Sequence, residues 1–228
     1  MYLTKIPPLL QRFYQKYTWR IDTDEPVLYL TFDDGPTPEI SQWVMDQLDV
    51  HDAKATFFWV GNNIPANAEL AHEIIDRRHQ IGNHTQNHRN GWTTPLRAYL
   101  RDFLRCQRTI FEYTGKRAQL FRPPYGRLTH TKARYIQRTH DIIMMDVLTG
   151  DFDTSLDADA CLENVIGKAQ PGSIILLHDS VKAWPRLESL LPRLLAYYAN
   201  QGYSFKALPR RSSRPSPPPK LEERSWEF

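Results

Sequence analysis

Short apolar runs alternate with longer amphipathic segments along most of this chain. The apolar runs are rich in β-branched and aromatic residues, which favour strands, and they cover residues 27–32, 55–60, 80–85, 120–124, 141–147, 173–179 and 203–208. The segments between them have helical periodicity and cover residues 38–50, 66–79, 94–114, 129–140, 157–169 and 186–200. Strands that alternate with helices build a parallel sheet, so this pattern predicts an α/β barrel with fewer than eight repeats.

Both ends of the chain lie outside this alternation. Residues 1–25 form an N-terminal extension, in which residues 9–20 predict a short amphipathic helix. Its apolar residues are Leu9, Leu10, Phe13, Tyr17 and Trp19. We expect this helix to pack on one end of the barrel, with attachment to a membrane surface as the alternative. Residues 26–208 form the barrel domain, and residues 209–228 are so rich in Pro, Ser and charge that they predict a disordered tail.

Composition limits the class of protein. With 228 residues, of which 41% are hydrophobic, the chain is long enough for one domain with a sizeable core. Its net charge of +3 is too small for a nucleic-acid-binding surface, although basic residues are dense between Arg97 and Arg138. Pro7 and Pro8 interrupt the apolar core that a signal peptide requires, and no run is long enough to span a membrane. We therefore expect a cytoplasmic protein without a membrane anchor, with export by another route as the alternative, and we take a monomer as the default.

The first predicted strand ends in two adjacent carboxylates, Asp33 and Asp34, at a Gly-Pro turn. Functional side chains of an α/β barrel lie at the carboxyl ends of its strands, where these residues stand. Adjacent residues leave a strand in opposite directions, so we expect one carboxylate to point to a metal and the other to substrate or water. The alternative is that this string has no role beyond forming a turn.

Two histidines, His84 and His88, follow the third predicted strand at a spacing of four residues. This spacing, in a tight loop or at a helix start, lets two imidazoles reach one ion. With Asp34 they make the ligand set of a catalytic zinc site, which leaves a position for water. Zinc lowers the pKa of a bound water from about 15.7 to about 7, which suits an amide hydrolase. Two histidines that simply face solvent are the alternative.

Two further strand ends carry reactive groups. Arg122 precedes two prolines and can hold a carboxylate through two hydrogen bonds, although a structural ion pair is the alternative. His178 ends a buried strand, where an imidazole is well placed as a general acid or base. A carboxylate at Asp151 can orient this ring and raise its pKa. A hydrogen-bonded core histidine is the alternative for His178.

Together, these strings resemble the polysaccharide deacetylase family, also called carbohydrate esterase family four or the NodB-homology domain. Its motifs are matched in order by TFDDG at 31–35, HTQNH at 84–88, RPPYG at 122–126, TGDFD at 149–153 and ILLHD at 175–179. AKATFFWVG at 53–61 is also similar to the family's second strand. The resemblance covers roughly residues 26–208 and implies a single-domain, distorted (β/α)7 barrel.

The resemblance also implies a role for each residue of these motifs. Asp34, His84 and His88 would bind a divalent metal, zinc first and cobalt or nickel as alternatives. Asp33 would be the general base and His178 the general acid, with support from Arg122 and Asp151. The backbone N–H of Tyr125 would face the oxyanion, and the substrate pocket would be lined by Pro123, Phe152 and Leu177. Phe152 stands where the family usually has Trp, and it lacks the indole N–H.

The function implied by the resemblance is removal of N-acetyl groups from amino sugars of a poly- or oligosaccharide. An O-deacetylase or another hydrolase of non-peptide C–N amide bonds is the nearest alternative, because the motifs do not identify the group that bears the acyl chain. A non-catalytic sugar-binding protein is an alternative from another class. Loss of the base or the acid would mark such a protein, whereas Asp33 and His178 are both present.

Overall fold

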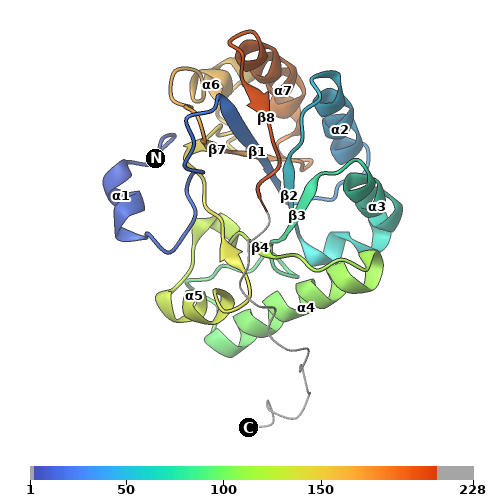
Figure 1. Cartoon of the computed structure of the whole chain (residues 1–228). Helices are drawn as coiled ribbons and strands as arrows, with labels where there is room; N and C mark the ends of the chain where they lie inside the picture. The colour runs from blue at the N-terminus through green and yellow to red at the C-terminus, as the bar shows by residue number, and fades with distance from the viewer. Residues whose placement is uncertain (1–2, 210–228) are drawn as a thin grey trace.

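The computed structural model describes residues 3–209, whose strands form one curled parallel sheet (Figure 1). Neighbouring strands follow the order β5-β4-β3-β2-β1-β7-β6, and β8 pairs with the start of β1. The strands are β1 (Val27–Asp33), β2 (Thr56–Trp59), β3 (Gln80–Asn83), β4 (Leu120–Phe121), β5 (Asp141–Ile142), β6 (Val147–Leu148), β7 (Ile174–His178) and β8 (Ser204–Phe205).

Helices surround this sheet on its outer side (Figure 1). They are α1 (Pro8–Phe13), α2 (Ile40–Val50), α3 (Ala68–Asp76), α4 (Leu96–Thr114), α5 (His130–Ile136), α6 (Ala158–Glu163) and α7 (Trp184–Ala199), with short 3-10 turns η1 (Gly61–Asn63), η2 (Pro65–Asn67) and η3 (Pro124–Gly126). The expected distorted (β/α)7 barrel is confirmed. No helix within residues 3–209 combines the length and apolar character needed to cross a membrane.

Side-chain alternation along β1 separates two apolar cores. Leu28, Leu30 and Phe32 belong to the cluster between the barrel and its helices. Val27 and Tyr29 belong to a smaller cluster that also receives side chains from β2, β4 and β7 and therefore fills the barrel interior. Successive strand residues point to opposite faces, so the next inward positions on β1 are Thr31 and Asp33. This alternation directs Asp33 into the barrel rather than toward the helices.

The run predicted as one strand, residues 141–147, is divided into β5 and β6. The guanidinium of Arg122 donates hydrogen bonds to the carbonyl oxygens of Ile143 and Met144, at 3.4 and 2.9 Å. The N–H of Met144 donates to the carbonyl oxygen of Thr18 at 2.7 Å. Because these backbone groups bond to a side chain and to the N-terminal segment, they cannot continue the sheet, and the strand is interrupted.

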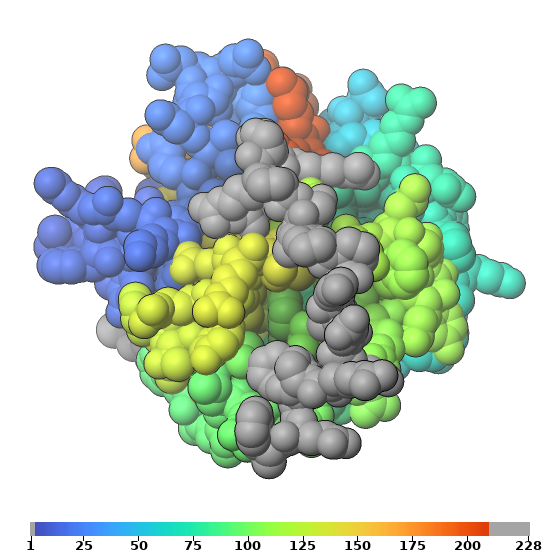
Figure 2. Space-filling view, turned by 60° about the horizontal axis from the view of Figure 1, so that its bottom comes forward, coloured from blue at the N-terminus to red at the C-terminus, as the bar shows by residue number. Residues whose placement is uncertain are grey.

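The N-terminal segment pairs with both edges of the open barrel. Thr18 forms a parallel bridge with Ile143, next to β5, and Lys5 forms an antiparallel bridge with Val147 of β6. Between these bridges the chain makes α1, which projects from the side of the molecule (Figures 1 and 2). The two ends of this segment thus fill the gap between the edge strands.

Helix α1 contacts the barrel differently from the sequence prediction. Leu9 and Phe13 are 67% and 76% exposed, and no residue of the helix is buried. The contact is polar, because the side-chain amide of Gln11 donates to Asp146 Oδ1 at 3.0 Å. Of the five apolar residues expected to make this contact, Trp19, which follows the helix, is the one that is buried in an apolar cluster. Most of the predicted tail, residues 210–228, lies outside the described residues.

Candidate active site

Asp33 and His178 lie side by side at the carboxyl ends of two neighbouring strands. They are paired in the register of β1 and β7, and each has the inward orientation of its strand. Asp34 comes after β1 and has φ 81°, a left-handed conformation that a non-glycine residue adopts only when its surroundings require it. This turn brings Asp34 to the same site as Asp33, where Asp34 lies in a cluster with His84 and His88 and Asp33 is bound by Arg122. Both carboxylates lie 3.7 Å from Nε2 of His84.

Three predicted metal ligands are gathered in one place. One ligand atom each from Asp34, His84 and His88 lie within 4.8 Å of one another. Nε2 of His88 is 3.2 Å from Asp34 Oδ1, and Nε2 of His84 is 3.7 Å from the same oxygen. The histidines lie in an irregular loop rather than a helix, because Thr85 and His88 have φ values of 65° and 52°.

The second nitrogen of each imidazole has a partner that orients the ring. Nδ1 of His84 lies 2.8 Å from the carbonyl oxygen of Arg122, which can only accept a hydrogen bond. Nδ1 of His88 lies 3.1 Å from the Tyr125 hydroxyl. In a neutral ring, a proton on Nδ1 leaves Nε2 unprotonated and available to a metal, as in metal-binding histidines. Burial and the neighbouring His84 lower the pKa of His88 to about 4, so this ring is neutral at pH 7.

The surroundings of Asp34 fit a bound cation. Its Oδ1 is buried and has no hydrogen-bond partner among the described residues. A buried carboxylate oxygen without a partner is costly, and Nε2 of His84 and Nε2 of His88 both face it. A divalent ion would satisfy all three groups at once. The two imidazoles and one carboxylate are also the donor set of catalytic zinc sites.

An acidic residue on α4, Asp102, fastens the histidine loop. It is buried, and its carboxylate accepts hydrogen bonds from the backbone N–H of Asn87 at 3.0 Å and from the Arg89 side chain at 3.1 Å. The Asn87 side chain also donates to it. Sequence reasoning missed this residue. Its signal was a carboxylate within the apolar stripe of α4, between Tyr99 and Phe103.

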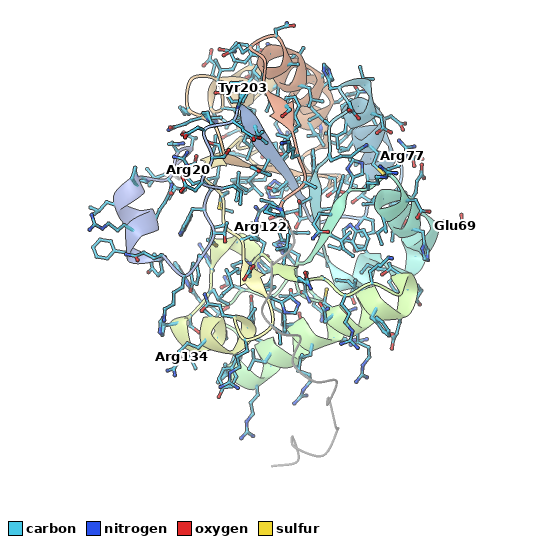
Figure 3. The ribbon with its side chains drawn as sticks, in the orientation of Figure 1. Arg20, Glu69, Arg77, Arg122, Arg134 and Tyr203 are labelled. Carbon is cyan, nitrogen blue, oxygen red and sulfur yellow. The ribbon has the colours of Figure 1, made fainter. Side chains whose placement is uncertain are left out.

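Arg122 joins β4 to β1 across the barrel interior and lies near the centre of the molecule (Figure 3). It is fully buried, and its Nη1 donates to Asp33 Oδ1 and to the Thr31 hydroxyl, each at 2.8 Å. Its guanidinium also lies 4.4 Å from the centre of the Phe58 ring. Burial by itself raises the pKa of Asp33, but the Arg122 charge and two neighbouring histidines outweigh it and hold that pKa below its ordinary value.

His178 is held by Asp151, a fully buried carboxylate. Asp151 accepts a hydrogen bond from the backbone N–H of His178 at 2.7 Å and lies 2.8 Å from its Nδ1. Burial alone would lower the pKa of His178. The charge and hydrogen bond of Asp151 outweigh this effect and raise the pKa to about 9. The ring is therefore an imidazolium at neutral pH, with Nε2 free of this contact.

Asp179, which sequence analysis left without a role, holds the turn that carries Asp34. It accepts hydrogen bonds from the Gly35 N–H at 3.1 Å and from the Ser41 hydroxyl. A Cβ on Gly35 would lie 2.1 Å from Asp179 Oδ2, so only glycine allows this approach. Burial, together with Asp34 and Asp33, raises the pKa of Asp179 to about 8. The sequence signal for this role was the position of Asp179 directly after His178 in the fifth motif, ILLHD.

The residues expected to line the substrate pocket are not all at the site. The Phe152 ring lies 5.3 Å from the His178 ring in an edge-to-face arrangement, and Pro123 follows Arg122 directly. Leu177 is fully buried in the cluster between the barrel and its helices, on the opposite face of β7 from His178. Because side chains alternate along a strand, the residue next to Leu177 is the one that faces the barrel interior. Leu176 has the inward orientation that Leu177 lacks.

Comparison with known proteins agrees with this fold. Residues 20–142 match the family model described as polysaccharide deacetylase, so the chain belongs to this family, as the motif resemblance implied. The class is therefore that of hydrolases acting on non-peptide carbon–nitrogen bonds.

Three relatives illustrate the membership. A peptidoglycan-N-acetylglucosamine deacetylase of Bacillus cereus is 29% identical over 201 residues, which cover 82% of this chain and 89% of that protein. A chitooligosaccharide deacetylase of Rhizobium leguminosarum bv. phaseoli is 35% identical over 161 residues, 69% of each chain. The crystal structure of a peptidoglycan N-acetylglucosamine deacetylase superposes with a TM-score of 0.82 at 27% identity, covering 90% of this chain and 96% of that one.

Proposed function

We propose that this hydrolase removes N-acetyl groups from amino sugars of a poly- or oligosaccharide. The observation that carries the proposal is the register pairing of Asp33 with His178 beside the cluster of Asp34, His84 and His88. A proton acceptor and a proton donor thereby flank one candidate metal site. Relatives named for peptidoglycan and for chitooligosaccharides support N-acetylglucosamine as the acetylated sugar.

Asp34, His84 and His88 would hold the metal, with zinc as the first candidate and cobalt or nickel as alternatives. When bound, the ion would supply Lewis acidity, which polarises an acyl oxygen and makes a nearby water more acidic. The protein's own contribution is to orient both imidazoles, through the partners of their Nδ1 atoms.

Asp33 would accept the proton of the attacking water. Its low pKa keeps the carboxylate ionised at neutral pH, as a proton acceptor requires. Oδ1 is held by the buried Arg122 guanidinium, while Oδ2 lies on the side of His84. Arg122 also donates hydrogen bonds to the carbonyl oxygens of Ile143 and Met144, so its guanidinium fixes the Asp33 carboxylate in one orientation. Such preorganisation avoids reorientation during the reaction.

His178 would donate a proton to the departing amine nitrogen. With its pKa raised to about 9, the ring carries this proton at neutral pH, and Asp151 stabilises that state. A positioned general acid typically contributes about 10²–10⁴ in rate. The backbone N–H of Tyr125 would stabilise the oxyanion, a contribution of about 2.7–4 kcal/mol for one donor. Acetate and a free amino sugar would be the products.

Acetate release from N-acetylglucosamine oligomers tests the proposal. We expect Asp33→Asn to retain bound metal, because Asp33 is outside the three-ligand cluster, while acetate release falls by at least about 10²-fold. His84→Ala is expected to lose both metal and activity. An active Asp33→Asn variant would contradict the role of Asp33 as base. Undiminished metal content of His84→Ala on elemental analysis would contradict the ligand set.

Two alternatives have separate outcomes. An O-deacetylase would release acetate from O-acetylated sugars but not from N-acetylated ones, so a panel containing both distinguishes the esters from the amides. A non-catalytic sugar-binding protein would bind these oligomers without releasing acetate from either kind. The presence of Asp33 and His178 in register argues against this second alternative.

A further inference from the structure

An exposed aromatic–cation pair lies in two loops next to the metal cluster. Trp92, in the loop that follows His88, is 62% exposed. The guanidinium carbon of Arg127, in the loop that follows η3, lies 5.1 Å from the centre of the Trp92 ring. None of the catalytic roles above uses either side chain. Isolated surface tryptophans are common, and exposure alone does not mark a binding site.

The two loops are joined through their backbones. Gly91 forms a parallel bridge with Leu128, and a Cβ at Gly91 would lie 2.2 Å from the carbonyl oxygen of Arg127. The buried ammonium of Lys132 donates a hydrogen bond to the Gly91 carbonyl oxygen at 2.8 Å. Burying an ammonium is costly unless it is bound, so this contact anchors the loop. Trp92 is therefore attached to a fixed backbone.

The same loops reach the metal cluster. The Tyr125 ring lies 4.6 Å from the ring of His88, and its hydroxyl lies 3.1 Å from Nδ1 of that histidine. Arg127 is two residues beyond Tyr125, and two residues of chain span at most about 7 Å. The Trp92–Arg127 pair thus belongs to the two loops that carry His88 of the candidate metal site and its partner Tyr125, which is where a sugar next to the reacting one would lie.

The chain segment that contains both loops is rich in basic residues. Arg127 forms no ion pair with a carboxylate of residues 3–209, and its side chain is exposed. Residues 89–140 contain twelve Lys and Arg but only two Asp and Glu, whereas the whole chain has a net charge of only +3. The remainder of the chain is therefore net acidic. A guanidinium binds a carboxylate through two hydrogen bonds, and the adjacent indole offers an apolar face to a sugar ring.

We propose that Trp92 and Arg127 form a second sugar subsite, which binds a carboxylate-bearing sugar next to the one that is deacetylated. Trp92 packs against the ring, and Arg127 binds the carboxylate. The inference rests on the proposed deacetylase function and adds the substrate class to it. That class is a glycan in which acidic sugars neighbour N-acetylated ones.

The test compares two oligosaccharides of equal length. One alternates N-acetylglucosamine with glucuronic acid, and the other contains N-acetylglucosamine alone. We expect the metal-loaded protein to have the higher kcat/KM for the acidic oligomer. Arg127→Gln is expected to reduce that value about 10-fold or more, through KM, and to change the neutral oligomer by less than about twofold, because hydrogen bonds to charged groups contribute about 1.5–3 kcal/mol. Trp92→Ala is expected to raise KM for both oligomers.

Arg101→Gln is the matched control, since it removes the same charge from an exposed position on α4. We expect it to leave both oligomers nearly unchanged. If Arg127→Gln and Arg101→Gln reduced kcat/KM for the acidic oligomer equally, general charge attraction, and not a subsite, would favour that oligomer, and the proposal would be overturned. The proposal would also be overturned if Arg127→Gln reduced kcat/KM equally for the acidic and the neutral oligomer.

Binding separates failure of the subsite from failure of the proposed function. Calorimetric titration with each oligomer measures affinity whether or not acetate is released. If the wild-type protein releases no acetate but Arg127→Gln selectively weakens binding of the acidic oligomer, the subsite stands and the deacetylase function fails. If acetate is released and Arg127→Gln binds both oligomers as the wild type does, the subsite fails and the deacetylase function stands.

Discussion

The hydrogen bonds between Asp151 and His178 predict a shift in the pH dependence of the reaction. Asp151 accepts from the backbone N–H of His178 at 2.7 Å and pairs with its Nδ1 at 2.8 Å, each through a different oxygen. In Asp151→Asn only one carboxamide oxygen remains, so one of these two groups loses its acceptor. The negative charge beside the imidazolium is also lost. Both effects favour the neutral ring.

The size of the shift follows from the lost interaction. A hydrogen bond to a charged group contributes about 1.5–3 kcal/mol, and one pKa unit corresponds to about 1.4 kcal/mol. The pKa of His178, raised to about 9 in the wild type, is therefore expected to fall by about 1–2 units in Asp151→Asn. A general acid must be protonated, and a lower pKa leaves less imidazolium above neutrality. As the pH rises, the activity of the variant should therefore fall at a lower pH than the activity of the wild type.

The assay is a pH profile of kcat/KM for acetate release from an N-acetylglucosamine oligomer. The alkaline limb is expected to move down by about 1–2 pH units, with a several-fold loss at pH 8 and little change near pH 6. Asp159→Asn is the control, because that carboxylate is 71% exposed and pairs with Arg193 on α7. An alkaline limb at the same pH in wild type and Asp151→Asn would refute the assignment of His178 as the acid.

Three other substitutions test the site and the fold. Tyr125→Phe removes the hydroxyl beside His88 and is expected to weaken metal binding by about 10–100-fold in a chelator competition; unchanged affinity would contradict the orienting role. Arg122→Met leaves Asp33 buried without its partner and is expected to reduce the free energy of unfolding in urea by about 3–5 kcal/mol, whereas a smaller loss would mean that water reaches the carboxylate. Asp146→Ala removes the acceptor that ties down the N-terminal segment, so that segment should be cleaved faster in limited proteolysis, while an unchanged rate would show that the backbone bridges suffice.

Motif positions were predictable because strand ends carry a local signal. A buried strand is an apolar run, and a reactive polar residue directly after it lies at the carboxyl edge of a parallel sheet. This reasoning places Asp33 and His178 on one edge, and the register of β1 with β7 brings them together. Leu177, which the family resemblance assigned to the pocket, is one residue out of phase with this alternation. In the structure Leu177 faces the helices.

Backbone conformation at the turns could not be predicted from residue types. Asp34, Thr85, His88 and Tyr125 all have positive φ, although none is glycine. Such conformations are unfavourable locally and persist because surrounding contacts impose them. One contact is the hydrogen bond from the Asn63 side chain to the carbonyl oxygen of Asp34, at 2.7 Å. These contacts come from distant parts of the chain, so no local pattern contains them.

The sequence by itself determined the alternation of strands and helices, the order of the motifs and the chemical identity of the ligand and proton-transfer groups. These depend on residue type and on spacing, which are local properties. Only the tertiary structure decided that a left-handed turn at Asp34 brings it beside Asp33 and that Asp102 and Asp179 hold the loops around the site. The same is true of Trp92 and Arg127, which belong to different loops and meet because Gly91 permits a close backbone approach. The physical reason is that each arrangement depends on contacts between residues far apart in the chain, and their energies exist only after the barrel has formed.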